Sequence, residues 1–246
     1  MNKDYYKEYY HYERENWWFR VRYQIIDHFL GKYLEGKQNL KILNIGVATG
    51  HSTEILMKYG DVKSIEYDSD CCKFTREMLN IEIIEGSITA LPFSDQAFDV
   101  VCALDVLEHI EDEKLAVSEI TRVCKKNGNV FITVPTFMSL WSRHDEVNFH
   151  FRRYRKKQIL TLFSKYKNLH STYFNTFLFP PILLFRSITR LFPNFRKADT
   201  GSDFSVLSKK SFLNKIFYWI FKLEYQTLKI IKYPFGVSYL YVGRKQ

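Results

Sequence analysis

The chain has 246 residues, 46% of them hydrophobic and 26% charged, which excludes an intrinsically disordered chain and is typical of one globular domain. The net charge of +9 comes mainly from the part after residue 150. Such a basic surface can attract nucleic acid, an anionic membrane or an acidic small molecule, or can simply be a solvated face.

The four cysteines and the apolar runs bear on the cellular compartment. No Cys-x-x-Cys pair is present and no histidine stands at zinc-ligand spacing, so we expect reduced core cysteines and no metal site. Residues 2–12 lack the apolar segment of a signal peptide, and the apolar run 177–185 is too short to span a bilayer. We therefore expect a cytoplasmic protein, with peripheral contact to the inner face of the membrane as an alternative.

The apolar pattern predicts helices and strands in alternation. Residues 18–29 have an apolar helix face, and after a polar break at 36–39 short apolar runs alternate with helical spacings, which is typical of a parallel α/β sheet. Strands are expected at residues 41–45, 62–66, 81–84, 98–103, 130–134, 169–174 and 235–242. Helices are expected at 51–58, 69–79, 111–124 and 155–166, the third with Leu115, Ile120 and Val123 facing inward and a stop at 125–128.

These elements predict one Rossmann-like α/β domain over residues 1–246. Its seven-stranded, mostly parallel sheet has helices on both faces. Residues 40–174 and 235–246 form the core of this domain, residues 1–36 form an N-terminal helical region, and residues 175–234 form a helical cap inserted before the last strand. The cap is rich in Phe, Ile, Leu, Lys and Arg, so it can shape an acceptor pocket or contact an anionic membrane or a lipid-linked acceptor.

The turn after the first strand carries small residues at every second position, Gly46, Ala48 and Gly50. Small residues let a backbone approach a ligand closely. The spacing differs from the G-x-G-x-x-G of dinucleotide-binding folds, and no P-loop follows. Glu66 ends the second strand, where an acidic side chain can accept hydrogen bonds from both ribose hydroxyls.

From Ile42 to Pro135 the sequence resembles the class I S-adenosylmethionine (AdoMet)-dependent methyltransferases, in the branch of methyltransferase types 11 and 12. The resemblance rests on the glycine turn, Glu66, the Leu91-Pro92-Phe93 segment and the stretch from Phe98-Asp99-Val100-Val101 to Leu107-Glu108-His109. It implies AdoMet as cofactor, with S-adenosylhomocysteine as product.

The resemblance also implies positions for the cofactor. Gly46, Ala48 and Gly50 would wrap the methionine moiety, and Trp17 and Trp18 would belong to a lid helix. The remaining contacts would be Glu66 on the ribose, Tyr67, Ser87 and the Ile88 backbone at the adenine, and Leu104 and Asp105 near the transferable methyl.

Three positions depart from the pattern of that family: Asn44, Ala48 and Ser87 stand where Asp or Glu, Gly, and Asp are usual. Asn44 and Ser87 can still form hydrogen bonds, and Ala48 is tolerable if its backbone angles are ordinary. The departures leave a non-catalytic member of the fold as an alternative.

Methyl transfer to an oxygen or nitrogen atom needs alignment and removal of a proton. His109 follows the fourth strand, and the loop after the fifth strand carries His144, Asp145 and His150, so these are the candidate catalytic residues. The alternatives are a structural histidine at the start of a helix for His109 and a solvated basic connector for the loop. The candidate substrate-binding residues are Arg152, Arg153 and Tyr154, because arginines can hold a phosphate or carboxylate group.

The predicted activity is methylation of an unidentified small-molecule or lipid-linked acceptor, with no obligate protein partner. The net charge motivates an RNA methyltransferase or RNA-binding protein as a rival. Nucleic acid is disfavoured because Leu104-Asp105-Val106-Leu107 stands where base methyltransferases carry an Asn/Asp-Pro-Pro-Tyr/Phe motif.

Overall fold

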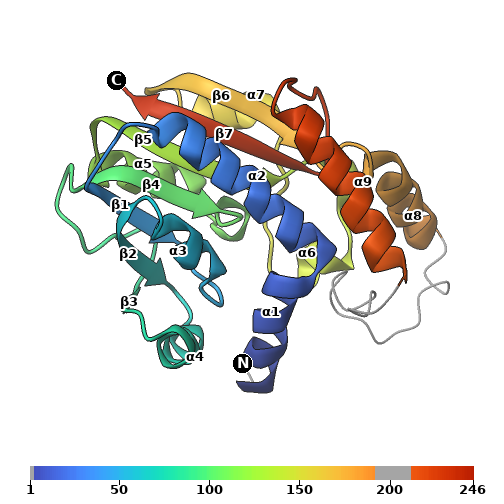
Figure 1. Cartoon of the computed structure of the whole chain (residues 1–246), viewed down its shortest axis with the longest axis horizontal. Helices are drawn as coiled ribbons and strands as arrows, with labels where there is room; N and C mark the ends of the chain where they lie inside the picture. The colour runs from blue at the N-terminus through green and yellow to red at the C-terminus, as the bar shows by residue number, and fades with distance from the viewer. Residues whose placement is uncertain (1–2, 192–211) are drawn as a thin grey trace.

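The computed structural model describes residues 3–191 and 212–246, and at its centre lies a seven-stranded sheet (Figure 1). The strands are β1 (Leu40–Ile45), β2 (Gly60–Glu66), β3 (Ile83–Glu85), β4 (Phe98–Leu104), β5 (Cys124–Pro135), β6 (Tyr166–Phe174) and β7 (Ser238–Lys245), in the order β3-β2-β1-β4-β5-β7-β6. The first five are parallel, and β7 runs antiparallel to both β5 and β6. This confirms the predicted mostly parallel sheet.

Helices cover both faces of the sheet because the side chains of each strand alternate between two apolar cores. Ile42 and Val100 pack with α2 and α9 on one face, whereas Leu43 and Val101 pack with α5 and α7 on the other. The described helices are α1 (Lys3–Glu15), α2 (Trp17–Leu34), α3 (His51–Leu56), α4 (Ser69–Leu79), α5 (Glu113–Val123), α6 (Arg143–Val147), α7 (Lys156–Leu162), α8 (Phe179–Leu191) and α9 (Phe212–Leu228), with 3-10 turns η1 (Leu107–His109) and η2 (Met138–Leu140).

The region from α5 to β5 differs from its prediction. Leu115 is 46% exposed, while Ile120 and Val123 are fully buried, so the inward face of α5 was placed wrongly at its first turn. The cause is the start of the helix at Asp112, whose side chain accepts a hydrogen bond from the Leu115 backbone. Strand β5 begins directly at Cys124, so the expected stop at residues 125–128 lies within the strand. Asn127 has the left-handed backbone expected of such a stop (φ 62°), and the pairing of β5 with β4 is irregular in this part.

Helices α8 and α9 lie in the predicted cap, of which residues 192–211 are outside the described part of the chain. Helix α9 packs along α2, where Lys222 donates to Gln24 and Asn214 accepts from the Trp17 backbone at 3.1 Å. The buried carboxylate of Glu224 accepts from the backbone of Thr176 at 2.7 Å. No helix in the described part of the chain has the length and apolarity needed to cross a membrane.

A buried histidine on β6 couples the stability of this face to pH. His170 is 6% exposed and packs against Phe29 with ring centroids 4.4 Å apart. Burial, helped by Lys232, Lys32 and His28, lowers the pKa of His170 to about 4. In an unfolded chain the pKa of a histidine is about 6.5, so between these pH values the unfolded state binds a proton that the folded state does not.

Above about pH 6.5 both states are neutral at His170, and the free energy of unfolding falls as the pH drops from there toward 4. The parent should lose free energy of unfolding when the pH is lowered from 7 to 4.5. We expect this loss to be smaller by about 2–3 kcal/mol in His170→Phe, which keeps a planar ring but has no group to protonate. Urea unfolding at both pH values measures this difference. Equal losses in parent and variant would contradict the assignment.

Candidate functional site

The candidate site lies at the edge of the sheet where four parallel strands end. The chain builds outward from β1 to β2 and β3 and then returns to place β4 on the other side of β1. Such a reversal of strand order is where open α/β sheets bind ligands. Backbone hydrogen bonds join the turn after each strand to the neighbouring strand. Gly46 donates to Ile65 at 3.0 Å, Gly86 to Glu66 at 2.9 Å, and Asp105 to Thr133 at 2.9 Å.

The turn after β1 has left-handed backbone at each of its predicted small residues. The φ angles are 73° at Gly46, 47° at Ala48 and 88° at Gly50. A Cβ added at Gly46 would lie 2.4 Å from Val106 Cγ2, so glycine is needed there to bring the turn against the loop after β4. Alanine was expected to be tolerated at position 48 only with ordinary backbone angles. Its left-handed φ does not meet this condition, so Ala48 adopts a strained conformation in the turn.

The carboxylate of Glu66 fixes the same turn from the end of β2. Its Oε2 accepts from the Ala48 backbone at 3.0 Å, and its Oε1 accepts from the backbones of Tyr67 at 2.8 Å and Asp68 at 3.2 Å. A carboxylate has about four acceptor sites, so Glu66 keeps capacity for a hydroxyl group. The neighbouring Tyr67 is 79% exposed and leaves its ring face available for packing.

The other predicted cofactor positions lie on the adjoining strand ends. Ser87 follows β3, and its hydroxyl bonds to Thr89 Oγ1 at 2.8 Å. The side chains of Ile88 and Leu104 are buried at 4% and 7% exposure, and contact of the Ile88 backbone with the adenine stays a prediction. Asn44 is fully buried and donates to the hydroxyls of Ser52 and Thr53 at 2.9 Å, which ties β1 to α3.

These features fit an adenosine with an amino-acid tail. The glycine-bearing turn admits close backbone approach, Glu66 has acceptor capacity suited to a ribose, and Tyr67 presents an exposed ring one residue further on. The contacts of each residue with the cofactor stay predictions.

The N-terminal helices lie against the turn after β1. Glu13 is 2% exposed, accepts a short hydrogen bond from Thr49 Oγ1, and accepts another from Tyr23 at 2.6 Å. Tyr6 donates to Asp68 at 2.9 Å. Helix α1 therefore packs against the turn after β1. Trp17 and Trp18 stand at the start of α2 and pack against the apolar core shared with α9, and their role in a lid stays a prediction.

Arg22 is a charged residue at this edge that the sequence reasoning missed. It is 3% exposed, pairs with Asp105 at 2.9 Å, and donates to Thr133 Oγ1 at 3.2 Å. Burial disfavours its charge, but the Asp105 carboxylate outweighs this and raises the pKa of Arg22. An arginine within the apolar stripe of α2 was the available signal.

The three predicted histidines lie close together beyond the ends of β4 and β5. The rings of His109 and His150 have centroids 4.5 Å apart, and His144 lies 6.0 Å from His150. His109 Nδ1 bonds to the Asn148 carbonyl at 2.9 Å. The predicted long loop contains the short helix α6, which carries His144 and Asp145.

Asp145 holds His150 in place and does not face solvent. It is fully buried, and its Oδ1 accepts from His150 Nδ1 at 2.9 Å and from Arg153 Nε at 2.7 Å. Burial opposes the charge on Asp145, but the hydrogen bond from His150 and the charge of Arg153 keep its pKa well below the usual range. Asp145 is therefore a positioning residue for His150.

The three predicted substrate-binding residues make internal contacts. Arg153 is 4% exposed and Tyr154 fully buried, and the Tyr154 hydroxyl donates to Glu113 at 2.6 Å. Arg152 pairs with Glu113 at 3.0 Å. Contact of these side chains with an acceptor stays a prediction.

Glu108 is the second residue that the sequence reasoning missed. It stands between Leu107 and His109 in η1, is 1% exposed, and its Oε2 has no hydrogen-bond partner among the described residues. Burial and the neighbouring Asp105 raise the pKa of Glu108 well above its ordinary value. Its position next to a candidate histidine was the available signal.

The sheet order defines a Rossmann-like α/β fold of the kind found in solved methyltransferase structures. Residues 43–132 match the family model described as "Methyltransferase domain". Over these residues the chain is similar to the class I AdoMet-dependent methyltransferases, whose methyl donor is AdoMet.

Relatives of known sequence and structure agree with this. The chain is 25% identical over 152 residues to a probable S-adenosylmethionine-dependent methyltransferase of Mycobacterium tuberculosis, covering 60% of this chain and 54% of that protein. It is 32% identical over 102 residues to a demethylmenaquinone methyltransferase of Renibacterium salmoninarum, covering 39% and 43%. The match thus spans about half the length of these relatives. A solved structure of a candidate methyltransferase from Bacillus halodurans shares the fold, with a TM-score of 0.60, 20% identity, and coverage of 89% and 98%.

The close contact at Gly46 makes a prediction about stability. We expect Gly46→Ala to lower the free energy of unfolding by about 2 kcal/mol or more, because the new Cβ adds a clash with Val106 to the strain of left-handed backbone. Gly36→Ala is the matched control, since φ there is 74° and nothing lies within 4 Å of the new Cβ. Urea unfolding compares the two, and an equal loss in both would show that Val106 yields without cost.

Proposed function

We propose that this protein transfers a methyl group from AdoMet to an oxygen or nitrogen atom of a small-molecule or lipid-linked acceptor. The observation that carries the proposal is the contact of Glu66 with Ala48, which joins the carboxylate expected to bind the ribose to the turn after β1 at the reversal of strand order. The names of the related proteins also support it.

In the proposed reaction the cofactor supplies a methyl group activated by a sulfonium. The Gly46–Gly50 turn and Glu66 orient the cofactor, and alignment with the acceptor accounts for several kcal/mol of barrier lowering. Asn148 and Asp145 accept from Nδ1 of His109 and His150, so in the neutral rings Nε2 carries the lone pair that can take a proton from the acceptor. Asp145 keeps His150 in that tautomer.

The role of Glu66 is tested by cofactor binding. We expect Glu66→Ala and Glu66→Gln to weaken binding of AdoMet and S-adenosylhomocysteine by about 10–100-fold, because each hydrogen bond to a charged group contributes about 1.5–3 kcal/mol. Calorimetric titration measures the affinity, and a loss of the ligand-induced thermal shift should accompany it. Glu82→Ala is the control, since Glu82 is an exposed carboxylate whose partner is Lys63. Parent-like affinity in both Glu66 variants would remove the ribose assignment.

We further propose a cytoplasmic protein that contacts the membrane peripherally. Supporting this are the free, buried cysteines and the exposed apolar side chains of the two cap helices. Leu184 and Phe185 on α8 are 62% and 52% exposed, and Trp219 and Leu223 on α9 are 68% and 61% exposed. Apolar side chains within a cation-rich segment suit the interface of an anionic bilayer or a lipid-linked acceptor.

Vesicle sedimentation tests the membrane contact. We expect the protein to pellet with phosphatidylglycerol vesicles and less with phosphatidylcholine vesicles, and Trp219→Ser with Leu223→Ser to reduce pelleting several-fold. Met78→Ser is the control, because Met78 is 46% exposed but lies on α4. Failure of the parent to pellet with anionic vesicles would exclude this contact and leave a small-molecule acceptor.

A further inference from the structure

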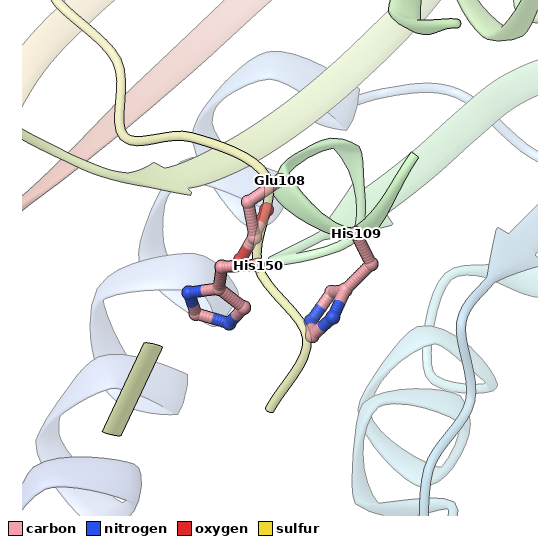
Figure 2. A group of neighbouring side chains, drawn as sticks. All are labelled: Glu108, His109 and His150. Carbon is pink, nitrogen blue, oxygen red and sulfur yellow. The ribbon is translucent and has the colours of Figure 1, made fainter. Parts of the chain in front are cut away.

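Three side chains near the ends of β4 and β5 are of types that bind metal ions and lie close together. Figure 2 shows Glu108 and His109 from the turn η1 and His150 from the segment after α6 gathered in one place. One ligand atom from each of the three lies within 4.8 Å of the others. We propose that Glu108, His109 and His150 bind one divalent transition-metal cation.

The hydrogen bonds of His109 and His150 fix the tautomer that a metal ligand needs. Asn148 O can only accept, so His109 Nδ1 carries the proton of their 2.9 Å bond. The ionised Asp145 likewise accepts from His150 Nδ1 at 2.9 Å. In both neutral rings Nε2 is then the lone-pair atom. A metal-bound histidine characteristically donates its other N–H to a carbonyl or carboxylate in this way.

Glu108 supplies an independent observation that points to a cation. Its side chain is 1% exposed, yet its Oε2 has no hydrogen-bond partner in the described part of the chain. A buried carboxylate oxygen without a partner is costly, and a metal ion is one of the few groups that satisfy it. The ligand segments are also fixed to each other, because the Phe151 backbone donates to the Glu108 carbonyl at 2.8 Å.

The donor set indicates the class of metal. Two imidazoles and one carboxylate suit Zn²⁺, Mn²⁺, Fe²⁺ or Co²⁺, whereas Mg²⁺ and Ca²⁺ favour sites made of oxygen ligands. Metal bonds of about 2.0–2.2 Å keep two ligand atoms of one cation at most about 4.4 Å apart, which is close to the limit of 4.8 Å that holds for the three atoms here. Three protein ligands leave coordination positions open for an oxygen ligand from outside the chain.

If the proposed methyl transfer holds, the cation defines the acceptor as an oxygen nucleophile. A hydroxyl coordinated to the cation ionises more readily. Its proton passes to water, the acceptor oxygen forms the new bond to the methyl carbon, and the sulfur keeps the electron pair of the bond that breaks. His109 and His150 would then hold the metal and not act as the base, because one Nε2 lone pair cannot serve both uses.

Metal titration of the full chain tests the site without any activity assay. After removal of metals with a chelator, we expect the parent to bind one equivalent of Zn²⁺ or Co²⁺ by calorimetry, with visible absorption bands from Co²⁺. His109→Gln, His150→Gln and Glu108→Gln should each weaken binding by at least about 10–100-fold. The control is His11→Gln, which removes an exposed histidine of α1.

Each result either supports or overturns the site. Binding of one equivalent that is lost in His109→Gln and kept in His11→Gln supports it. Absence of stoichiometric binding in the parent, or equal binding in His109→Gln and His11→Gln, overturns it. Because His109 is largely exposed, this variant serves as the test even where Glu108→Gln fails to fold.

Two further measurements separate this inference from the proposed function. Acetohydroxamate, a bidentate oxygen ligand, should shift the Co²⁺ bands, and unchanged bands would rule out open coordination positions. AdoMet affinity is measured in parallel on the metal-free parent. Metal binding without AdoMet binding would sink the proposed function alone, and AdoMet binding without metal binding would sink the metal site alone.

Discussion

The ion pair between the buried Arg22 and the partly exposed Asp105 is the contact on which the candidate site depends. Arg22 comes from α2, yet it bonds to the end of β4 and to Thr133 of β5. It therefore fixes the N-terminal helices to the strand ends and balances a carboxylate that stands three residues before Glu108. Removal of one partner of a buried pair leaves an uncompensated charge, which typically costs about 3–5 kcal/mol. Without Arg22, the partly exposed Asp105 carboxylate would lose its ion-pair partner beside the buried Glu108.

Most of the fold was predictable from sequence because the parallel strands are short apolar runs between helical spacings. Helix α4 was predicted with its observed limits, since Asp68 caps its start and Asn80 adopts left-handed backbone at its end. The prediction for α5 and β5 was less accurate because local pattern does not show where tertiary packing overrides it. Leu115 looks like a core residue in sequence but lies on the first turn, directed to solvent by the Asp112 cap. Likewise, Lys125 to Gly128 read as a loop, whereas pairing with β4 extends β5 back to Cys124.

The candidate site was predictable where one segment suffices and not where distant segments meet. The turn at Gly46 and the carboxylate of Glu66 each follow a strand, so sequence alone placed them at one edge. The roles of Asp145, Arg153 and Tyr154 depend on contacts with η1, α5 and β5, which sequence spacing does not show. Arg153 was expected to face an acceptor but is enclosed with Asp145, and Glu108 was overlooked because acidic residues are rarely buried without a partner.

Several acidic side chains lie at the strand ends, whereas the net charge of the chain is positive. The carboxylates of Glu66, Asp105 and Glu108 lie at neighbouring strand ends, whereas the cationic excess belongs to the later part of the sequence. A sulfonium and a divalent cation carry the complementary charge. The net charge of +9 therefore says little about the chemistry at the strand ends.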